Sequence, residues 1–323
     1  MFFPVSGVEI NPLIPPLIAL IVASITTSAG VSGAFLLLPF QVSVLNYVNP
    51  SVSSTNLVYN IVATPGGLYR YIKEERMAWP LAWVIAAGTL PGVFAGSWIR
   101  INYLLDPRSF KLFIGGVLLY LGLKLVADLI GGIINPNFRN NALEERFKER
   151  AAAIKMAKGQ KNHSWLPPEA VVQVKKCNLS AIEYTFWGET YSFSVPVIFI
   201  LSLGVGLIGG IYGIGGGAII APFCVSVLGL PVYTVAGAAL AGTFLTSVAG
   251  VLFYSLLAVF STSEAACLAA PDWTLGMLFG IGGLAGAYCG AYLQKYLKEK
   301  LIKMIMAVLV LGLALQYVLQ FFI

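Results

Sequence analysis

One block of glycines and apolar residues occurs twice in this chain. Gly30-Val31-Ser32-Gly33 precedes an apolar run that ends in Pro-Phe, and so does Gly213-Ile214-Gly215-Gly216. The offset of 183 positions (213 minus 30) holds without a gap up to residue 71, and residues 79–96 recur as residues 273–290 at an offset of 194 (273 minus 79). Duplication of this kind indicates two related halves. Glycine-interrupted apolar segments at corresponding positions point to a binding site between them.

The composition is that of an integral membrane protein. Hydrophobic residues make up 58% of the chain, charged residues only 11%, and the mean hydropathy is +0.83. Soluble domains carry about a quarter charged residues. The long uncharged stretches can cross a bilayer several times as helices, whereas a membrane β-barrel would show short alternating segments.

Each half contains five apolar segments, of which the first two are short. At about 13–18 residues these two span about 20–27 Å as helices, which is less than the bilayer core. We therefore expect each pair to form a re-entrant hairpin that breaks at its glycines near mid-depth. The ten segments are 13–29, 34–48, 53–70, 78–99, 109–131, 194–211, 217–229, 233–258, 273–294 and 302–322.

A returning hairpin adds no net crossing, so each half crosses the membrane an odd number of times and the second half is inverted. If the two arms are instead tilted full spans, the parity is unchanged. Basic residues agree with this parity, because those near residues 70–76, 139–176 and 295–303 fall on one side. The positive-inside tendency makes that side cytoplasmic and places both termini outside.

The expected fold is an all-α polytopic membrane protein of two inverted-topology repeats, each a re-entrant hairpin plus three transmembrane helices. The first repeat spans 1–134 and the second 193–323. A cytoplasmic linker, 135–192, separates them, with an amphipathic helix at 142–158 and a β-hairpin in 169–194. The linker is either a connector or a regulatory or partner-binding surface.

Several functional classes fit the sequence poorly. Gly213 to Ala218 formally fits a dinucleotide-binding pattern, but no acidic residue follows for the ribose and the flanks are apolar. No Walker A motif follows either. The four cysteines and His163 lack metal-ligand spacing, so we expect no metal and no cofactor. The chain offers no catalytic constellation at membrane depth, so we do not expect an enzyme. Basic cytoplasmic loops explain the net charge of +6 without nucleic acid.

Neutral hydrogen-bonding residues surround the glycine breaks and form the predicted substrate site. An amide in a membrane helix is hard to satisfy locally, whereas a hydroxyl often only bonds its own i−4 carbonyl, and that alternative stays open for each Ser and Thr. The candidate residues are Thr27, Ser28, Gly30, Ser32, Gly33, Asn56, Asn60, Thr64, Gly213, Gly215, Gly216, Thr243, Thr246 and Ser247.

The restarting helices favour an anion as the ligand. Where a helix restarts after a break, its first N–H groups are expected to be unpaired and to point into the protein, as does the positive end of its dipole. Two such ends from opposite faces, near Gly33 and Gly216, would suit a small oxyanion. A metal cation would require carboxylates, and none is expected at that depth.

The duplicated hairpin resembles the TauE/SafE sulfite exporter family. The resemblance lies in Gly213-Ile-Gly-Gly-Gly-Ala-Ile-Ile-Ala-Pro-Phe and Gly30-Val-Ser-Gly-Ala-Phe-Leu-Leu-Leu-Pro-Phe, and the stretch from Ser53 to Gly67 is also similar. It implies passage of sulfite, sulfonates or related sulfur oxyanions across the cytoplasmic membrane of a prokaryote. The long central loop departs from the family pattern, as do Ser32 and Ala34 where the second copy has glycines.

Our hypothesis is a multi-pass secondary transporter in the inner cell membrane. It would export a small sulfur oxyanion by alternating access around a neutral site at the membrane midplane. The alternatives are a channel-like pore for the same ions, an uptake carrier of a small organic acid, and a sensing protein that acts through the central loop. The expected partners are the anion and the lipid bilayer, and the oligomeric state is open, a homodimer included.

Overall fold

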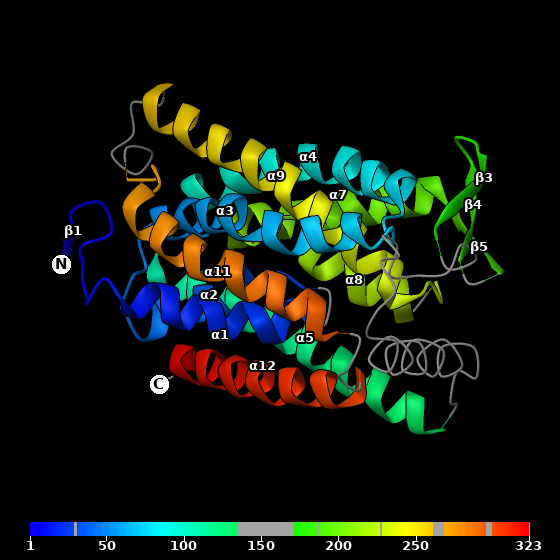
Figure 1. Ribbon diagram of the computed structural model, residues 1–323. Helices are drawn as coiled ribbons and strands as arrows, with labels where there is room; N and C mark the ends of the chain where they lie inside the picture. Colours follow the sequence, from blue (N-terminus) through cyan, green and yellow to red (C-terminus); the bar gives the residue numbers. More distant parts are fainter. Residues whose placement is uncertain are drawn as a thin grey trace, which may run out of the picture.

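We describe a computed structural model of the chain, which is mostly helical (Figure 1). The residues described are 1–28, 31–134, 171–186, 188–226, 228–260, 268–294 and 299–322. The expected helix at 142–158 and Gly30 lie outside these ranges. Five of the described helices are long and apolar enough to cross a membrane, namely those within 79–102, 107–127, 195–212, 232–260 and 273–293. The protein is therefore a multi-pass membrane protein.

The described helices follow the ten apolar segments closely. In the first half they are α1 (Ile14–Ser28), α2 (Ala34–Ser43), α3 (Ser51–Lys73), α4 (Trp79–Asn102) and α5 (Pro107–Ile134). In the second half they are α7 (Val195–Tyr212), α8 (Gly217–Ser226), α9 (Val232–Phe260), α11 (Trp273–Leu293) and α12 (Glu299–Phe322). A short N-terminal hairpin of β1 (Phe2–Phe3) and β2 (Val8–Glu9) precedes α1.

The two halves exchange their first helices. Helix α1 packs along α11 of the other half, and α7 packs along α4. Both contacts use glycines spaced by four, at which a side chain would collide with a carbonyl of the partner helix. On α4 these are Gly88, Gly92 and Gly96, facing Phe199, Leu203 and Leu207. On α11 they are Gly282, Gly286 and Gly290, facing Pro16, Leu20 and Ser24. Small residues permit this close approach, and the register is the same in both pairs.

Corresponding helices of the two halves run in opposite directions (Figure 1). The central helices α3 and α9 cross antiparallel, because Gly250 lies against Leu57 near the start of α3 and Gly237 against Tyr71 near its end. Helices α1 and α11 run parallel to α3, whereas α4 and α7 run parallel to α9. Helices α5 and α12 form a separate antiparallel pair beside this bundle.

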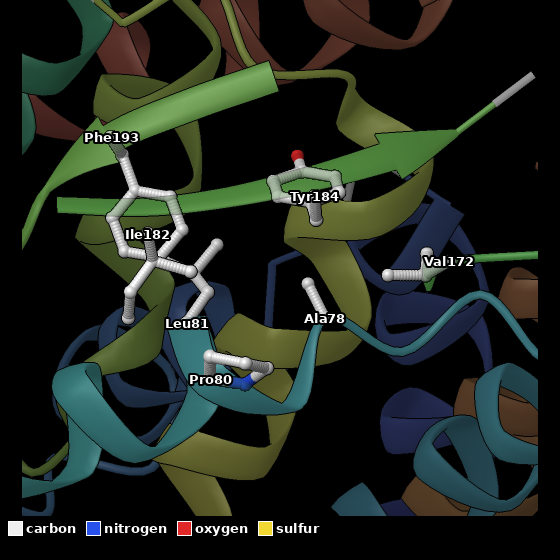
Figure 2. Close-up of a pocket in the computed structure, with 7 residues that line it drawn as sticks. All are labelled: Ala78, Pro80, Leu81, Val172, Ile182, Tyr184 and Phe193. Atoms are coloured by element: carbon white, nitrogen blue, oxygen red, sulfur yellow. The ribbon is translucent and has the colours of Figure 1, made fainter. Parts of the chain in front are cut away.

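A three-stranded antiparallel sheet follows the undescribed part of the linker. Its strands are β3 (Gln173–Cys177), β4 (Ala181–Phe186) and β5 (Glu189–Ser194), in that order, and β5 leads directly into α7. The apolar face of the sheet closes over the start of α4 and leaves a narrow apolar pocket lined by Ala78, Pro80, Leu81, Val172, Ile182, Tyr184 and Phe193 (Figure 2). The Tyr184 hydroxyl also lies 3.0 Å from the hydroxyl of Thr234 at the start of α9.

The sheet and the chain termini lie at opposite ends of the helices (Figure 1). Helix α2 lies toward the end with the termini, and α8 toward the end with the sheet. The two short helices therefore approach the interior from opposite ends, and the chain breaks that precede them lie inside the bundle, where Val31, Gly33, Ile214 and Gly216 are all buried. This arrangement positions the candidate site.

Candidate functional site

The break between α7 and α8 depends on two glycines in the left-handed region. Gly213 ends α7 with a φ of +78° and donates its N–H to the Gly209 carbonyl at 2.8 Å, and Gly215 has a φ of +71°. A side chain is strained in this backbone conformation, whereas glycine adopts it freely. The chain can therefore stop one helix at Gly213 and begin the next at Gly217.

Threonines of α9 cap the restarting helix. The Gly216 N–H donates to Thr246 Oγ1 and the Gly217 N–H to Thr243 Oγ1, each at 3.1 Å. The sequence led us to expect unpaired N–H groups here, and for these two groups that expectation is wrong. A buried N–H without a partner is costly, so side chains from a neighbouring helix satisfy it. The dipole of α8 still points its positive end at the break.

The break between α1 and α2 is held by Ser32. Its hydroxyl accepts the N–H of Ala34 at 3.3 Å and donates to the side-chain carbonyl of Asn60 on α3. Gly33 lies against Tyr59, which is on the same helix as Asn60. Helix α3 thus packs directly on the first break.

Two asparagines of α3 connect both breaks. Asn56 Nδ2 donates to the Ala34 carbonyl at 3.0 Å and to the Gly213 carbonyl at 2.9 Å. Asn60 Nδ2 donates to the Ile214 carbonyl at 3.0 Å. The breaks of the two halves therefore lie together, one asparagine side chain apart. We call this region the break junction, which comprises residues 31–34 and 213–217 together with Asn56 and Asn60.

Further hydrogen bonds surround the junction, and the first two of them join the halves. Ser53 Oγ on α3 donates to the Ile211 carbonyl at 2.9 Å, and the Tyr212 hydroxyl donates to the Phe35 carbonyl at 3.2 Å. The Tyr254 hydroxyl of α9 donates to the Gly210 carbonyl of α7 at 2.7 Å. Both ends of the second break and the start of α2 are thus fixed by side chains.

The family model described as Sulfite exporter TauE/SafE matches residues 16–317 of the 323 in the chain. The match includes both breaks and every helix that contacts them. The chain belongs to the TauE/SafE family. The family is one of membrane transporters of sulfur-containing anions. Comparisons with curated proteins and with solved structures gave no match.

In this TauE/SafE protein, most of the predicted site residues meet at or beside the junction. Those brought together are Ser32, Gly33, Asn56, Asn60, Gly213, Gly215, Gly216, Thr243, Thr246 and Ser247. Ser28 and Thr64 donate to backbone carbonyls of their own helices, at Ile25 and Asn60. Thr27 packs its side chain toward glycines of α3 and α11. Gly30 is not among the described residues.

Sequence reasoning missed two residues that contact the junction. Gln41 on α2 is fully buried and donates to Asn56 Oδ1 at 3.2 Å, so it orients the asparagine that joins the breaks. It is the only side-chain amide within α2, which was the available signal. Tyr59 was noted only for its spacing on α3, and its buried hydroxyl at Gly33 has no partner among the described residues.

Charged side chains of the described residues gather at the helix ends, with Lys124 inside α5 as an exception. Near the sheet, the buried Glu74 carboxylate contacts Arg70 at 2.6 Å and Arg76 at 2.7 Å, and Arg76 Nη1 donates to Gln294 at 3.1 Å. At the opposite end, Arg100 lies 3.7 Å from the Phe110 ring centroid. No hydrogen bond described at the junction involves a charged side chain.

One cavity of 350 Å³ lies outside the junction, between α5, α7 and α8. Its lining is almost wholly apolar and carries no charged side chain, so it suits an oxyanion poorly. The lining residues are Phe113, Gly116, Val117, Tyr120, Leu121, Ile208 and Ile219.

Proposed function

We propose that this protein is a secondary transporter that exports a small sulfur oxyanion, such as sulfite or an organosulfonate, by alternating access. Membership of the TauE/SafE family supports the class of substrate. The observation that carries the mechanism is the break junction, where one side chain, Asn56, bonds the backbone of both halves. A site shared by two halves can be exposed to either side when the halves move relative to each other.

The two halves are, in this proposal, inverted-topology repeats with re-entrant hairpins. Three features support it: the antiparallel course of α3 and α9, the shared glycine register of the α1–α11 and α4–α7 pairs, and the approach of α2 and α8 from opposite ends. The end that carries the sheet is cytoplasmic and both termini are outside, because basic residues gather at the former.

The junction suits an anion because of its backbone. The N-termini of α2 and α8 both face it, and each helix end is equivalent to about half a positive charge. The hydroxyl groups of Ser32, Thr243 and Thr246 accept hydrogen bonds from backbone N–H groups at these helix ends. When the breaks separate, the amide hydrogens that Asn56 and Asn60 now donate to carbonyls become available to the substrate.

The packing favours moving bodies that mix the two halves. Helix α11 packs on both α1 and α3, and α4 packs on both α7 and α9, whereas α3 and α9 meet across the middle. We propose that these two sets rock against each other around the junction. For an exported monoanion, an inside-negative potential contributes about 2.3 kcal/mol per charge per 100 mV, so transport does not require ATP.

Reconstitution of the purified protein in liposomes tests the proposal. We expect saturable efflux of radiolabelled sulfite, and strongly reduced efflux for Asn60→Ala. Asn102→Ala is the matched control, because that asparagine is exposed at the end of α4 and bonds only Trp98 of its own helix. Unitary conductance steps would instead identify a pore. Transport of acetate or lactate but not of sulfite would identify a carrier of small organic acids.

A further inference from the structure

Two buried hydroxyl groups at the junction lack hydrogen-bond partners among the described residues. Tyr59 on α3 is 1% exposed and its hydroxyl lies against Gly33 of the first break. Ser247 on α9 is fully buried and its Oγ lies beside Gly215 of the second break. Burying a hydroxyl without a partner is unfavourable. A bound ligand would satisfy both groups.

The positive charge available at the junction is small. Two helix ends of about half a charge each sum to about one elementary charge. The hydrogen bonds described there come only from neutral side chains and backbone groups. One negative charge on a ligand would be balanced, whereas a second would be buried without a counter-charge, which is strongly unfavourable in a low-dielectric interior.

The break junction contains no histidine and no other titratable side chain. Titratable or charged side chains occur on most of the packed helices. They are Tyr59, Tyr69, Arg70, Tyr71 and Lys73 on α3, followed by Glu74, Glu75 and Arg76, then Arg100 on α4, Arg108, Lys111, Tyr120, Lys124 and Asp128 on α5, Tyr212 on α7, Cys224 on α8, Tyr233 and Tyr254 on α9, Asp272 at the start of α11 with Tyr288, Cys289 and Tyr292 on it, and Glu299, Lys300, Lys303 and Tyr317 on α12. Lys124 lies over the Phe223 ring of α8, at 4.2 Å from its centroid. Between about pH 5 and 8 only histidine ordinarily titrates, and the sole histidine, His163, lies in the central linker.

We propose that the junction selects singly charged sulfur oxyanions, hydrogensulfite and organosulfonates, over the doubly charged sulfite and sulfate ions. The hydroxyls of Tyr59 and Ser247, one from each half, donate hydrogen bonds to the bound anion. This inference rests on the proposed function and adds the charge state of the substrate. Hydrogensulfite loses its proton near neutral pH, whereas methanesulfonate stays a monoanion, so the two ligands separate substrate charge from protein charge.

The test measures binding to the detergent-purified full chain by titration calorimetry. We expect methanesulfonate to bind equally at about pH 6 and about pH 8, because no junction group titrates between them. Sulfite should bind more weakly at the higher pH, in proportion to the loss of hydrogensulfite. The affinity for sulfate should be lower than the affinity for methanesulfonate by a factor of about 100 or more. Sulfate binding within about tenfold of methanesulfonate, or sulfite binding that tightens as the pH rises, overturns the proposal.

Two variants test the donors. Tyr59→Phe and Ser247→Ala should each weaken methanesulfonate binding by about tenfold or more, while the thermal stability of the ligand-free protein is unchanged or increased. The controls are Tyr184→Phe, whose hydroxyl bonds Thr234 at the sheet, and Ser202→Ala, a buried hydroxyl without a described partner that lies beside Gly88. Both controls should bind normally. Wild-type affinity in either test variant overturns its assignment as a donor.

Failure of the inference and failure of the proposed function give different results. Saturable transport of sulfate as fast as that of methanesulfonate leaves the transporter in place and removes the charge selectivity. If none of these anions binds the wild-type protein or crosses the liposome membrane with its help, both proposals are wrong.

Discussion

Asn56 on α3 lies 2.9 Å from the Gly213 carbonyl, so a helix of the first half holds the chain break of the second. The same amide group donates to the Ala34 carbonyl at 3.0 Å, which makes Asn56 a direct connection between the start of α2 and the end of α7. The polar interior of this membrane protein is organised around that contact.

Asn56→Ala should destabilise the protein. The substitution leaves the carbonyls of Ala34 and Gly213 without this donor and Gln41 Nε2 without its acceptor. Each buried polar group that loses its partner costs about 1–3 kcal/mol. Thermal unfolding in detergent should show a clearly lower midpoint for Asn56→Ala than for Asn102→Ala, whose side chain is exposed. Equal midpoints would mean that the connection between the breaks contributes no stability.

Gly213→Ala should be more destabilising than Gly204→Ala, although both glycines belong to the α7 region. Gly213 has a φ of +78° and its Cα faces the backbone of Ser53, so an added methyl group is both strained and crowded. Gly204 lies inside the helix with open space beside it, where alanine is favoured by up to about 1 kcal/mol. Unfolding midpoints of the two variants should move in opposite directions. A Gly213→Ala variant as stable as the wild type would contradict the conformation of the break.

Gly92→Ala and Gly286→Ala should lower stability to a similar extent. The two glycines occupy equivalent positions on α4 and α11, and each faces a carbonyl of the helix that the other half contributes. A methyl group there forces the helices apart, and overpacking of a tight contact costs about 1–3 kcal/mol. Gly116→Ala on α5, which has open space, is the control. A large loss of stability for only one of the two variants would show that the α4–α7 and α1–α11 contacts do not contribute equally to stability.

Glu74→Gln should be strongly destabilising, because it leaves the fully buried Arg76 without its ion pair. Breaking a buried pair by removing one partner costs about 3–5 kcal/mol. The double variant Glu74→Gln with Arg76→Met should regain part of this loss, since no buried charge is left unpaired. A double-mutant cycle of unfolding free energies measures the coupling. If the two substitutions change the unfolding free energy additively, the ion pair contributes no coupling energy, which would mean that solvent reaches Arg76.

The helix positions follow from local sequence patterns, and most were predictable. The apolar segment 194–211 corresponds to α7 at Val195–Tyr212, because apolar residues and a glycine mark its limits. The segment 34–48 was too long, since α2 ends at Ser43 and Asn46 adopts a φ of +53°. Apolar residues continue past that turn, so hydropathy alone could not detect the end of the helix.

The connections of the candidate site were less predictable. The sequence indicated Asn56 and Asn60 as polar groups at membrane depth, but not that their amides bond carbonyls of the opposite half. It indicated Thr243 and Thr246 without their role as caps of α8. Gln41 and Tyr59 depend on contacts between segments far apart in the chain, and no local pattern reveals such contacts.

The sequence by itself determined the duplication, the membrane class, the limits of most helices and the two glycine breaks, because these depend on local hydrophobicity, backbone freedom and repeat spacing. Only the tertiary structure decided that α1 packs on α11 and α7 on α4, that the breaks meet at Asn56, and that Tyr59 and Ser247 have no described partner. Those features depend on which neutral donors and acceptors come within hydrogen-bond distance after packing, and the chain offers many alternatives that only the complete fold distinguishes.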